Sequence, residues 1–194
     1  MKDIQVIGTF CQRGSFELLE ESLDRLRSCH YFCDETKKYA TAQDDQKARW
    51  YFRASLSSYQ SALDNIDGDV KRAIGTNTWD KSEQKRAMYS HPLVKILSKS
   101  RNFAVHSSRL RGVAKNYYVT VLDGKGERIE SMRSLFFEEL HNKKNFKDAS
   151  SVSSEELEWF NKQATTWPVD LLIRHGLHEA STFIHHFCAV NGVK

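Results

Sequence analysis

Hydrophobic residues recur at helical spacing along most of the chain. Steps of three and four residues separate the apolar positions, and such steps place side chains on one face of a helix. Two long helices that pack together in a bundle are therefore expected. Trp50 and Tyr51 should widen the apolar face of the second one. The first stripe runs through Leu19, Leu23, Leu26, His30 and Cys33, and the second through Phe52, Leu56, Tyr59, Leu63, Ile66 and Val70.

Polar and turn-forming segments indicate where these two helices begin and end. Ser15 is the expected N-cap of the first helix, and the polar run 41–46 is the expected connection to the second. The Gly-Thr-Asn sequence at 75–77 should end the second helix. Ahead of the first helix, apolar and polar residues alternate, which predicts a short strand or extended arm at 3–10.

Further helices are indicated by their start signals. Proline is tolerated in a first helical turn, so a third helix is expected to begin near Pro92. Ser153 and Glu156 have the spacing of a capping box, which predicts a helix after them. Pro168 should be the first residue of a last apolar helix that Gly192 ends.

The region between the third helix and the capping box has a different pattern. Residues 117–121 are aromatic and β-branched, residues 123–126 form a glycine-containing turn, and residues 127–130 can return as a second strand. We therefore expect a β-hairpin inserted at about 113–131. The segment 134–140 is compatible with either a third strand or a short helix.

Composition narrows the class of protein. The chain has 194 residues, of which 40% are hydrophobic and 28% charged, typical of an ordered globular protein. We expect one domain over 1–194: a mainly α helical bundle of four or more helices with a small β-hairpin. No apolar run has the length of a membrane span, and the N-terminus lacks the pattern of an export signal, which predicts a cytoplasmic protein without membrane association. A net charge of +4 permits contact with nucleic acid without requiring it.

The cysteines raise the question of a metal site. Cys29 and Cys33 lie four residues apart on the expected first helix, and His185, His186 and Cys188 lie near the C-terminus. Such side chains could bind zinc, but the spacing is not that of a zinc finger or ribbon. We expect reduced cysteines in the core, no metal and no cofactor.

The most informative stretch lies on the expected third helix. Arg101, Asn102 and His106 combine a permanent cation, an amide and a titratable imidazole, and Asn102 and His106 share a helix face. Arg101 is about 140° from His106 around an ideal helix. By chance this triplet should occur on the order of 0.02 times in a chain of this composition. A second Arg–His pair of the same spacing, at Arg86 and His91, lacks the amide.

The Arg-Asn-x-x-x-His arrangement of Arg101, Asn102 and His106 resembles the signature of the HEPN superfamily (higher eukaryotes and prokaryotes nucleotide-binding domain). The resemblance implies an α-helical bundle that forms a homodimer. It also implies a metal-independent endoribonuclease of the kind found in toxin–antitoxin and phage-defence systems, with RNA as substrate and a nucleotidyltransferase-like antitoxin as a partner. In this role His106 would transfer protons, Arg101 would stabilise the charge of the transition state, and Asn102 would orient the phosphate or the imidazole.

Two more cations follow the motif. Arg109 and Arg111 could contact the RNA backbone, or they could provide favourable charge at the C-terminal end of the helix. Two other classes of function remain open beside the nuclease: a non-catalytic helical module for RNA or protein binding, and a helical protein stabilised by zinc.

Overall fold

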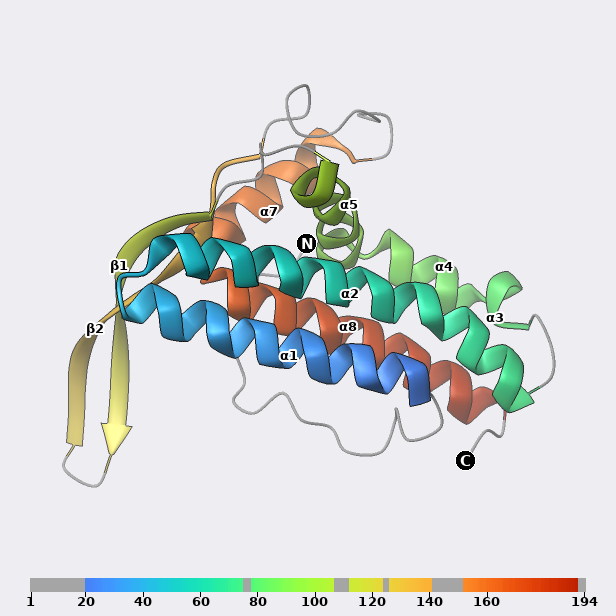
Figure 1. Cartoon of the computed structure of the whole chain (residues 1–194). Helices are drawn as coiled ribbons and strands as arrows, with labels where there is room; N and C mark the ends of the chain where they lie inside the picture. The colour runs from blue at the N-terminus through green and yellow to red at the C-terminus, as the bar shows by residue number, and fades with distance from the viewer. Residues whose placement is uncertain (1–19, 75–77, 107–111, 124–125, 141–151, 192–194) are drawn as a thin grey trace.

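The computed structural model describes residues 20–74, 78–106, 112–123, 126–140 and 152–191, and within them it is mainly helical with one antiparallel β-hairpin (Figure 1). The elements are α1 Glu20–Thr41, α2 Asp45–Ile74, α3 Thr78–Lys81, α4 Glu83–Ser90, α5 Pro92–His106, β1 Gly112–Asp123, β2 Gly126–Phe137, α7 Ser154–Thr166 and α8 Val169–Val190. The expected fold class, a helical bundle with a small hairpin, is confirmed. No described helix is both long enough and apolar enough to cross a membrane.

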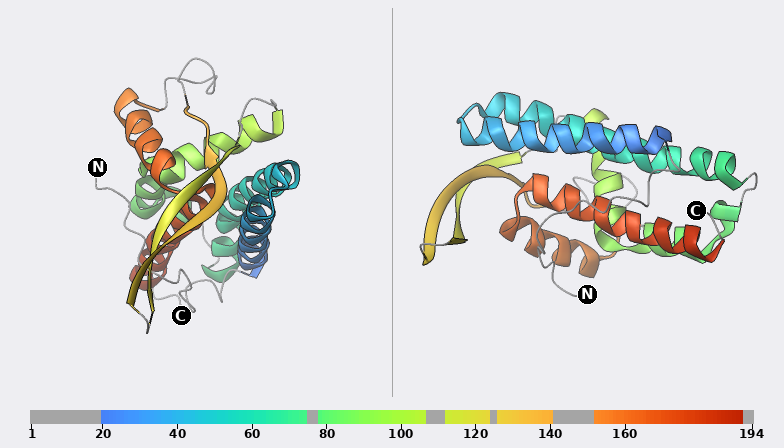
Figure 2. Two further views of the ribbon diagram at one scale, coloured as in Figure 1. Left: turned by 90° about the vertical axis from the view of Figure 1, so that its left-hand side faces the viewer. Right: turned by 90° about the horizontal axis from the view of Figure 1, so that it is seen from below.

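Helices α1 and α2 form a long antiparallel pair, and α8 runs alongside them (Figures 1 and 2). The predicted connection 41–46 is shorter in the structure, because α2 already begins at Asp45, an acidic residue suited to a helix N-terminus. The turn is closed by Gln43, whose φ of 61° is left-handed, and by a hydrogen bond from the Asp44 amide to the Tyr39 carbonyl. The two apolar stripes thus meet in the core.

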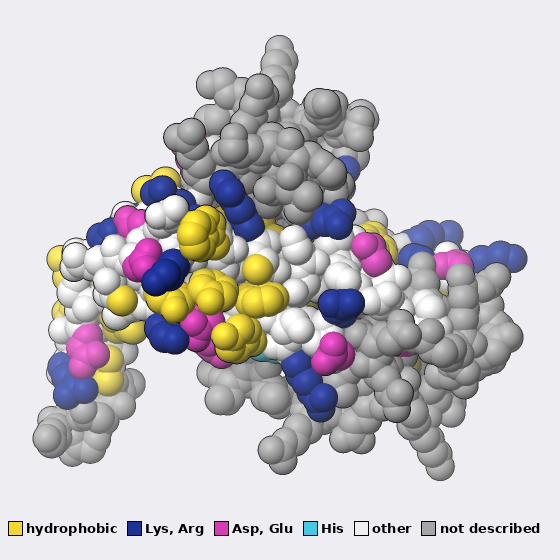
Figure 3. All heavy atoms as spheres, in the orientation of Figure 1, with side chains coloured by type: hydrophobic (Ala, Val, Ile, Leu, Met, Phe, Trp, Pro, Cys, Tyr) yellow, Lys and Arg dark blue, Asp and Glu magenta, His cyan; other side chains and the backbone are white. Residues whose placement is uncertain are grey.

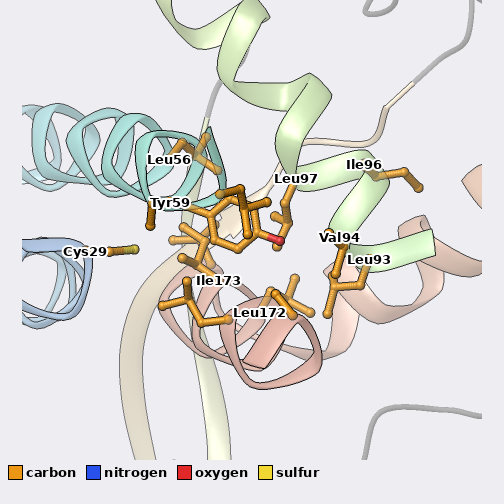
Figure 4. Packing of buried hydrophobic residues seen from close by; sticks show 14 of the residues in the cluster. Cys29, Leu56, Tyr59, Leu93, Val94, Ile96, Leu97, Leu172 and Ile173 are labelled. Atoms are coloured by element: carbon orange, nitrogen blue, oxygen red, sulfur yellow. The ribbon is translucent and has the colours of Figure 1, made fainter. Parts of the chain in front are cut away.

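The core is built where α2, α5 and α8 converge (Figure 4). Leu56 and Tyr59 of α2 and Leu97 of α5 are fully buried there, together with Leu172 of α8. Gly176 of α8 lies close to both neighbouring helices, because an added Cβ would lie 2.5 Å from Leu97 Cδ1 and 3.3 Å from the Tyr59 hydroxyl. The glycine therefore sets the spacing of α8 from its two neighbours.

Two short helices precede α5 and were not predicted from the sequence. Ser82 caps α4 by accepting a hydrogen bond from the Lys85 amide, and the helix ends at His91, whose backbone is extended ahead of Pro92. In α3, Trp79 is buried and its ring lies 4.9 Å from that of Phe187 on α8. Helices of four and eight residues are too short to show an apolar period, so the pattern could not reveal them.

The two C-terminal helices start close to where the sequence placed them. Ser153 and Glu156 form the expected capping box of α7. Pro168, the predicted first residue of the last helix, is the N-cap of α8, and the helix begins one residue later at Val169. The other predicted boundary features, namely the strand 3–10, Ser15, residues 75–77 and Gly192, lie outside the described residues.

The β-hairpin is longer than predicted. Each strand has 12 residues, paired from Gly112 with Phe137 to Asp123 with Gly126. Residues 134–137, which were ambiguous between strand and helix, are the C-terminal end of β2, because β1 begins early enough to pair with them. They are buried against the helices, whereas the distal half of the hairpin extends away from the bundle (Figure 2).

The base of the hairpin is attached to the start of α2. Arg49 Nε donates a hydrogen bond of 3.1 Å to the Gly112 carbonyl on β1. The Arg133 guanidinium on β2 binds both carboxylate oxygens of Asp45 at 3.0 Å. Both strands are thus held by the same helix end.

The close approach at Gly176 gives the first prediction. Gly176→Ala should lower the free energy of unfolding by about 1 kcal/mol, because overpacking at Leu97 and Tyr59 outweighs the gain in helix propensity. Urea unfolding monitored by circular dichroism measures the change. In a Leu97→Ala background the added methyl has room, so the same substitution should stabilise the protein. Additive effects of the two substitutions would contradict this explanation.

Candidate active site

Helix α5 carries the motif and is held in place by its apolar face. Leu93, Val94, Ile96 and Leu97 are fully buried, as is Ser100, immediately before the motif. This face packs against α2 and α8 in the core (Figure 4). The direction of α5 is therefore set by the core, and its last turns carry the motif away from it.

The helix continues through His106, so the motif residues have the helical spacing that was predicted for them. Asn102 and His106 are one turn apart on the same side of α5, and His106 is its last residue. The side chain of Arg101 is half-buried. For residues 102–106 the structure describes the helical backbone, and the predicted RNA-binding residues Arg109 and Arg111 lie outside the described residues.

An ion pair fixes α5 to α7 on the motif-bearing side of the core. Lys95 Nζ lies 2.9 Å from both carboxylate oxygens of Glu156, the residue that also completes the capping box with Ser153. Partial burial acts to raise the pKa of Glu156, but the hydrogen bonds from Lys95 and Ser153 outweigh it and hold that pKa below its ordinary value. Lys95 and Glu156 therefore act in positioning the helix.

A different Arg–His contact, which the sequence did not reveal, joins α1 to α8. Arg174 Nη1 on α8 donates to His30 Nδ1 on α1 at 3.1 Å, and its Nη2 binds the Asp34 carboxylate. Burial, followed by the charge of Arg174, lowers the pKa of His30. Arginine has only donors, so this contact requires a neutral imidazole at Nδ1. The contact joins α1 to α8, and no sequence spacing could have predicted it.

His91, the histidine of the second Arg–His pair in the sequence, lies beside a carboxylate of α8. His91 Nε2 lies 3.8 Å from Glu179 Oε2 on α8, and His175 Nε2 lies 3.3 Å from Glu179 Oε1. Burial lowers the pKa of both imidazoles, although the charge of Glu179 acts in the opposite direction. His91 thus belongs to a half-buried group around Glu179 on α8.

The cysteines of the first stripe lie in the core, as the stripe predicted. Cys29 and Cys33 are fully buried, and Cys29 Sγ donates to the Ser55 carbonyl at 3.3 Å. A hydrogen bond with Cys29, together with burial, raises the pKa of Cys33 well above its ordinary value. Within the described ranges, no three His, Cys, Asp or Glu residues are arranged so that they could hold a metal ion. The zinc hypothesis therefore gains no support from these residues.

Comparisons with protein-family models, with curated proteins and with solved structures find no match to this chain. The motif, its helix and the surface around it are therefore the basis for a functional proposal.

One aromatic residue of α2 lies on a different face from the one expected. Trp50 was expected on the apolar face of the second helix, but 56% of its surface is exposed. Tyr31 on α1 is 55% exposed, although the core stripe of that helix includes His30. The step from Trp50 to Phe52 turns the chain by about 200° around the helix, which could have shown that both cannot face the core.

Three half-buried histidines should make the protein less stable in acid. Their lowered pKa values mean that His30, His91 and His175 bind protons less readily than in the unfolded chain, where the pKa is about 6.5. The unfolded state therefore takes up more protons below that pH, and the free energy of unfolding should fall as the pH drops from 7.5 to 5.5. Urea unfolding at several pH values measures this slope.

Single substitutions separate the histidines from other titrating groups. Burial raises the pKa of Asp170, which gives a slope of the opposite sign, so each variant is compared with the wild type. His91→Gln and His175→Gln should each flatten the acid slope, whereas His186→Gln, at an exposed position, should leave it unchanged. Equal slopes in all three variants would exclude this origin.

Proposed function

We propose that this chain is a metal-independent endoribonuclease of the HEPN type. One observation carries the proposal: Arg101, Asn102 and His106 lie on the last two turns of a continuous helix whose other face is buried in a helical bundle. A cation, an amide and an imidazole in this arrangement are the groups that cleavage of a phosphodiester needs. The helical bundle itself agrees with the resemblance.

The proposed chemistry uses a nucleophile that the substrate contains. His106 takes the proton of a ribose 2′-hydroxyl, whose oxygen attacks the adjacent phosphorus. Arg101 stabilises the negative charge on the phosphorane-like transition state, and Asn102 orients the phosphate or the imidazole. The bond to the 5′-oxygen breaks, that oxygen takes up a proton, and a 2′,3′-cyclic phosphate remains. No step of this reaction requires a metal ion.

The partial negative charge at the C-terminal end of α5 means that a phosphate bound there would need cations close by. The last carbonyl groups of a helix carry partial negative charge, which repels a phosphate. His106 is the last residue of α5, so bound RNA would require positive charge close by. Arg101 precedes this end, and the sequence continues with Arg109 and Arg111, the residues proposed to contact the RNA backbone.

The proposed active form is a homodimer in which the motif helices face one another. Arg101 and His106 are separated by about 140° around α5, so one helix does not direct both side chains to the same point. A second copy could supply the missing group from its own motif. A cytoplasmic toxin or phage-defence role, with a nucleotidyltransferase-like antitoxin as partner, is the biological setting that the resemblance favours.

One observation favours a second candidate, a non-catalytic RNA-binding module with the same bundle. Exposed aromatic rings on α1 and α2 are suited to nucleotide binding, and they do not depend on proton transfer by His106. A cleavage assay separates the two candidates, because only the nuclease loses a measurable activity when His106 is replaced.

The nuclease proposal predicts that His106→Ala and Arg101→Ala each abolish RNA cleavage without unfolding the protein. The expected loss is on the order of 10²–10⁴-fold, the usual contribution of general acid–base catalysis. A gel assay with labelled RNA measures it, and circular dichroism confirms the fold. Cleavage should persist in EDTA, and DNA should not be cut because it lacks the 2′-hydroxyl.

The control for this experiment is His91→Ala, which removes the histidine of the second Arg–His pair, beside Glu179. This substitution should leave activity nearly intact. If His106→Ala cuts RNA as fast as the wild type, the nuclease proposal fails and the binding module replaces it.

The dimer proposal predicts a species of twice the 22.5 kDa chain mass in solution. Mixing inactive Arg101→Ala chains with inactive His106→Ala chains should restore part of the activity, because a mixed dimer contains one intact composite site. Light scattering at micromolar concentration measures the mass. A species of 22.5 kDa alone would contradict the proposal.

A further inference from the structure

A row of aromatic rings crosses the α1–α2 pair. Tyr31 and Phe32 are in edge contact with centroids 5.5 Å apart, and Phe32 lies 6.2 Å from Tyr51 across the helix pair. Tyr51 stacks on Tyr39 at 5.3 Å with an interplanar angle of 3°. With Trp50 beside Tyr51 on α2, these five residues are called the aromatic face.

The two outer members of the aromatic face are open to solvent. Tyr31 and Trp50 are more than half exposed, whereas Phe32, Tyr39 and Tyr51 are half-buried beneath and between them. Figure 3 shows hydrophobic side chains gathered over α1 and α2 on this side, with charged side chains around them. The half-buried rings support the exposed rings, and a flat ligand can stack on the exposed rings.

Cations surround the aromatic face. Lys38 Nζ and Lys47 Nζ lie 5.2 and 5.1 Å from the centroid of the Tyr39 ring. Each is also paired with a carboxylate, Lys38 with Glu35 at 3.0 Å and Lys47 with Asp44 at 3.1 Å. Such exposed pairs are weak, so both lysines keep their attraction for an anion.

Two arginines add charge that these carboxylates do not balance. Arg27 lies one turn before Tyr31 on α1, and Arg53 lies one turn after Trp50 on α2. Neither forms an ion pair within the described part of the chain. The aromatic face is therefore bordered by more positive than negative charge, which suits a polyanion. In a symmetric contact between two copies of this face, the same cations would be brought together.

The end of the motif helix lies on the same side of the molecule. Helix α5 packs against α2, and its C-terminal end lies above the α1–α2 pair in the left view of Figure 2. A ligand lying across the aromatic face can therefore continue toward Arg101 and the helix end at His106.

We propose that the aromatic face binds single-stranded RNA by stacking bases on Tyr31 and Trp50, while Arg27 and Arg53 contact the phosphates. The proposal rests on the nuclease function for its biological role, because the bound strand would lead to the motif. Stacking uses the flat face of a base, so binding tolerates different sequences. Bases inside a duplex are already stacked, so a double strand should bind less well.

The test measures binding without cleavage. Fluorescence anisotropy is recorded with a labelled single-stranded 2′-O-methyl RNA of mixed sequence, which lacks the nucleophile and cannot be cut. Trp50→Ala and Tyr31→Ala should each weaken binding about tenfold to a hundredfold, the usual effect of losing one base–aromatic stack. Arg27→Gln and Arg53→Gln should each reduce the dependence of log Kd on log salt concentration by roughly 0.7.

Tyr118→Ala is the matched control. Tyr118 is an aromatic residue on the hairpin, 75% exposed and outside the aromatic face, so its removal should leave binding unchanged. Thermal unfolding of each variant confirms that the fold is kept. Wild-type affinity in Trp50→Ala, no binding by the wild type, or equal loss in Tyr118→Ala would each overturn the proposal.

The outcomes for binding and for cleavage are distinct. If Trp50→Ala loses RNA binding while His106→Ala still cuts, the aromatic face stands and the nuclease fails. If His106→Ala abolishes cleavage while Trp50→Ala binds normally, the nuclease stands and the aromatic face fails. If Trp50→Ala converts a dimer into a monomer without a change in RNA affinity, a second copy occupies the face and the proposal is wrong.

Discussion

The contact of Gly176 with Leu97 and Tyr59 is the constraint on which the arrangement of the helices depends. A glycine on α8 lets that helix lie directly against Leu97 of α5 and Tyr59 of α2. Because α5 is held there by its N-terminal half, its C-terminal half has a defined direction. The proposed chemistry at Arg101 and His106 therefore depends on a packing contact at Leu97, one turn before Arg101 on the same helix.

The two Arg–His pairs discussed above are placed in different ways. Arg174 and His30 come from distant parts of the chain, and both are hydrogen-bonded within the fold. Their contact stabilises the join between α1 and α8. Arg101 and His106 instead lie five residues apart near the end of one helix, and their proposed partner is a ligand or a second copy. This difference in placement, more than residue type, separates a structural pair from a candidate catalytic pair.

Local signals predicted most of the helices, and tertiary contacts account for the rest. The Ser153 capping box and the start at Pro92 depend on adjacent residues, so the sequence contained them in full. The length of the hairpin depends on Gly112 pairing with Phe137, a contact between segments that no local pattern specifies. For the candidate site, the motif residues were readable from their spacing. The exposed position of Trp50 was also implied by the sequence, because Trp50 and Phe52 lie about 200° apart around the helix.

The contact between Arg174 and His30 also bears on how the chain folds during synthesis. These residues are 144 positions apart, so α1 cannot make this contact until Arg174 has left the ribosome. The α1–α2 pair can form early, because its contacts are close in sequence. Both helices also pack against α8, so part of their apolar surface is not covered until α8 has formed. A nascent chain that stops before Val169 would leave this apolar surface exposed to chaperones. Docking of α8 is therefore the step that buries it.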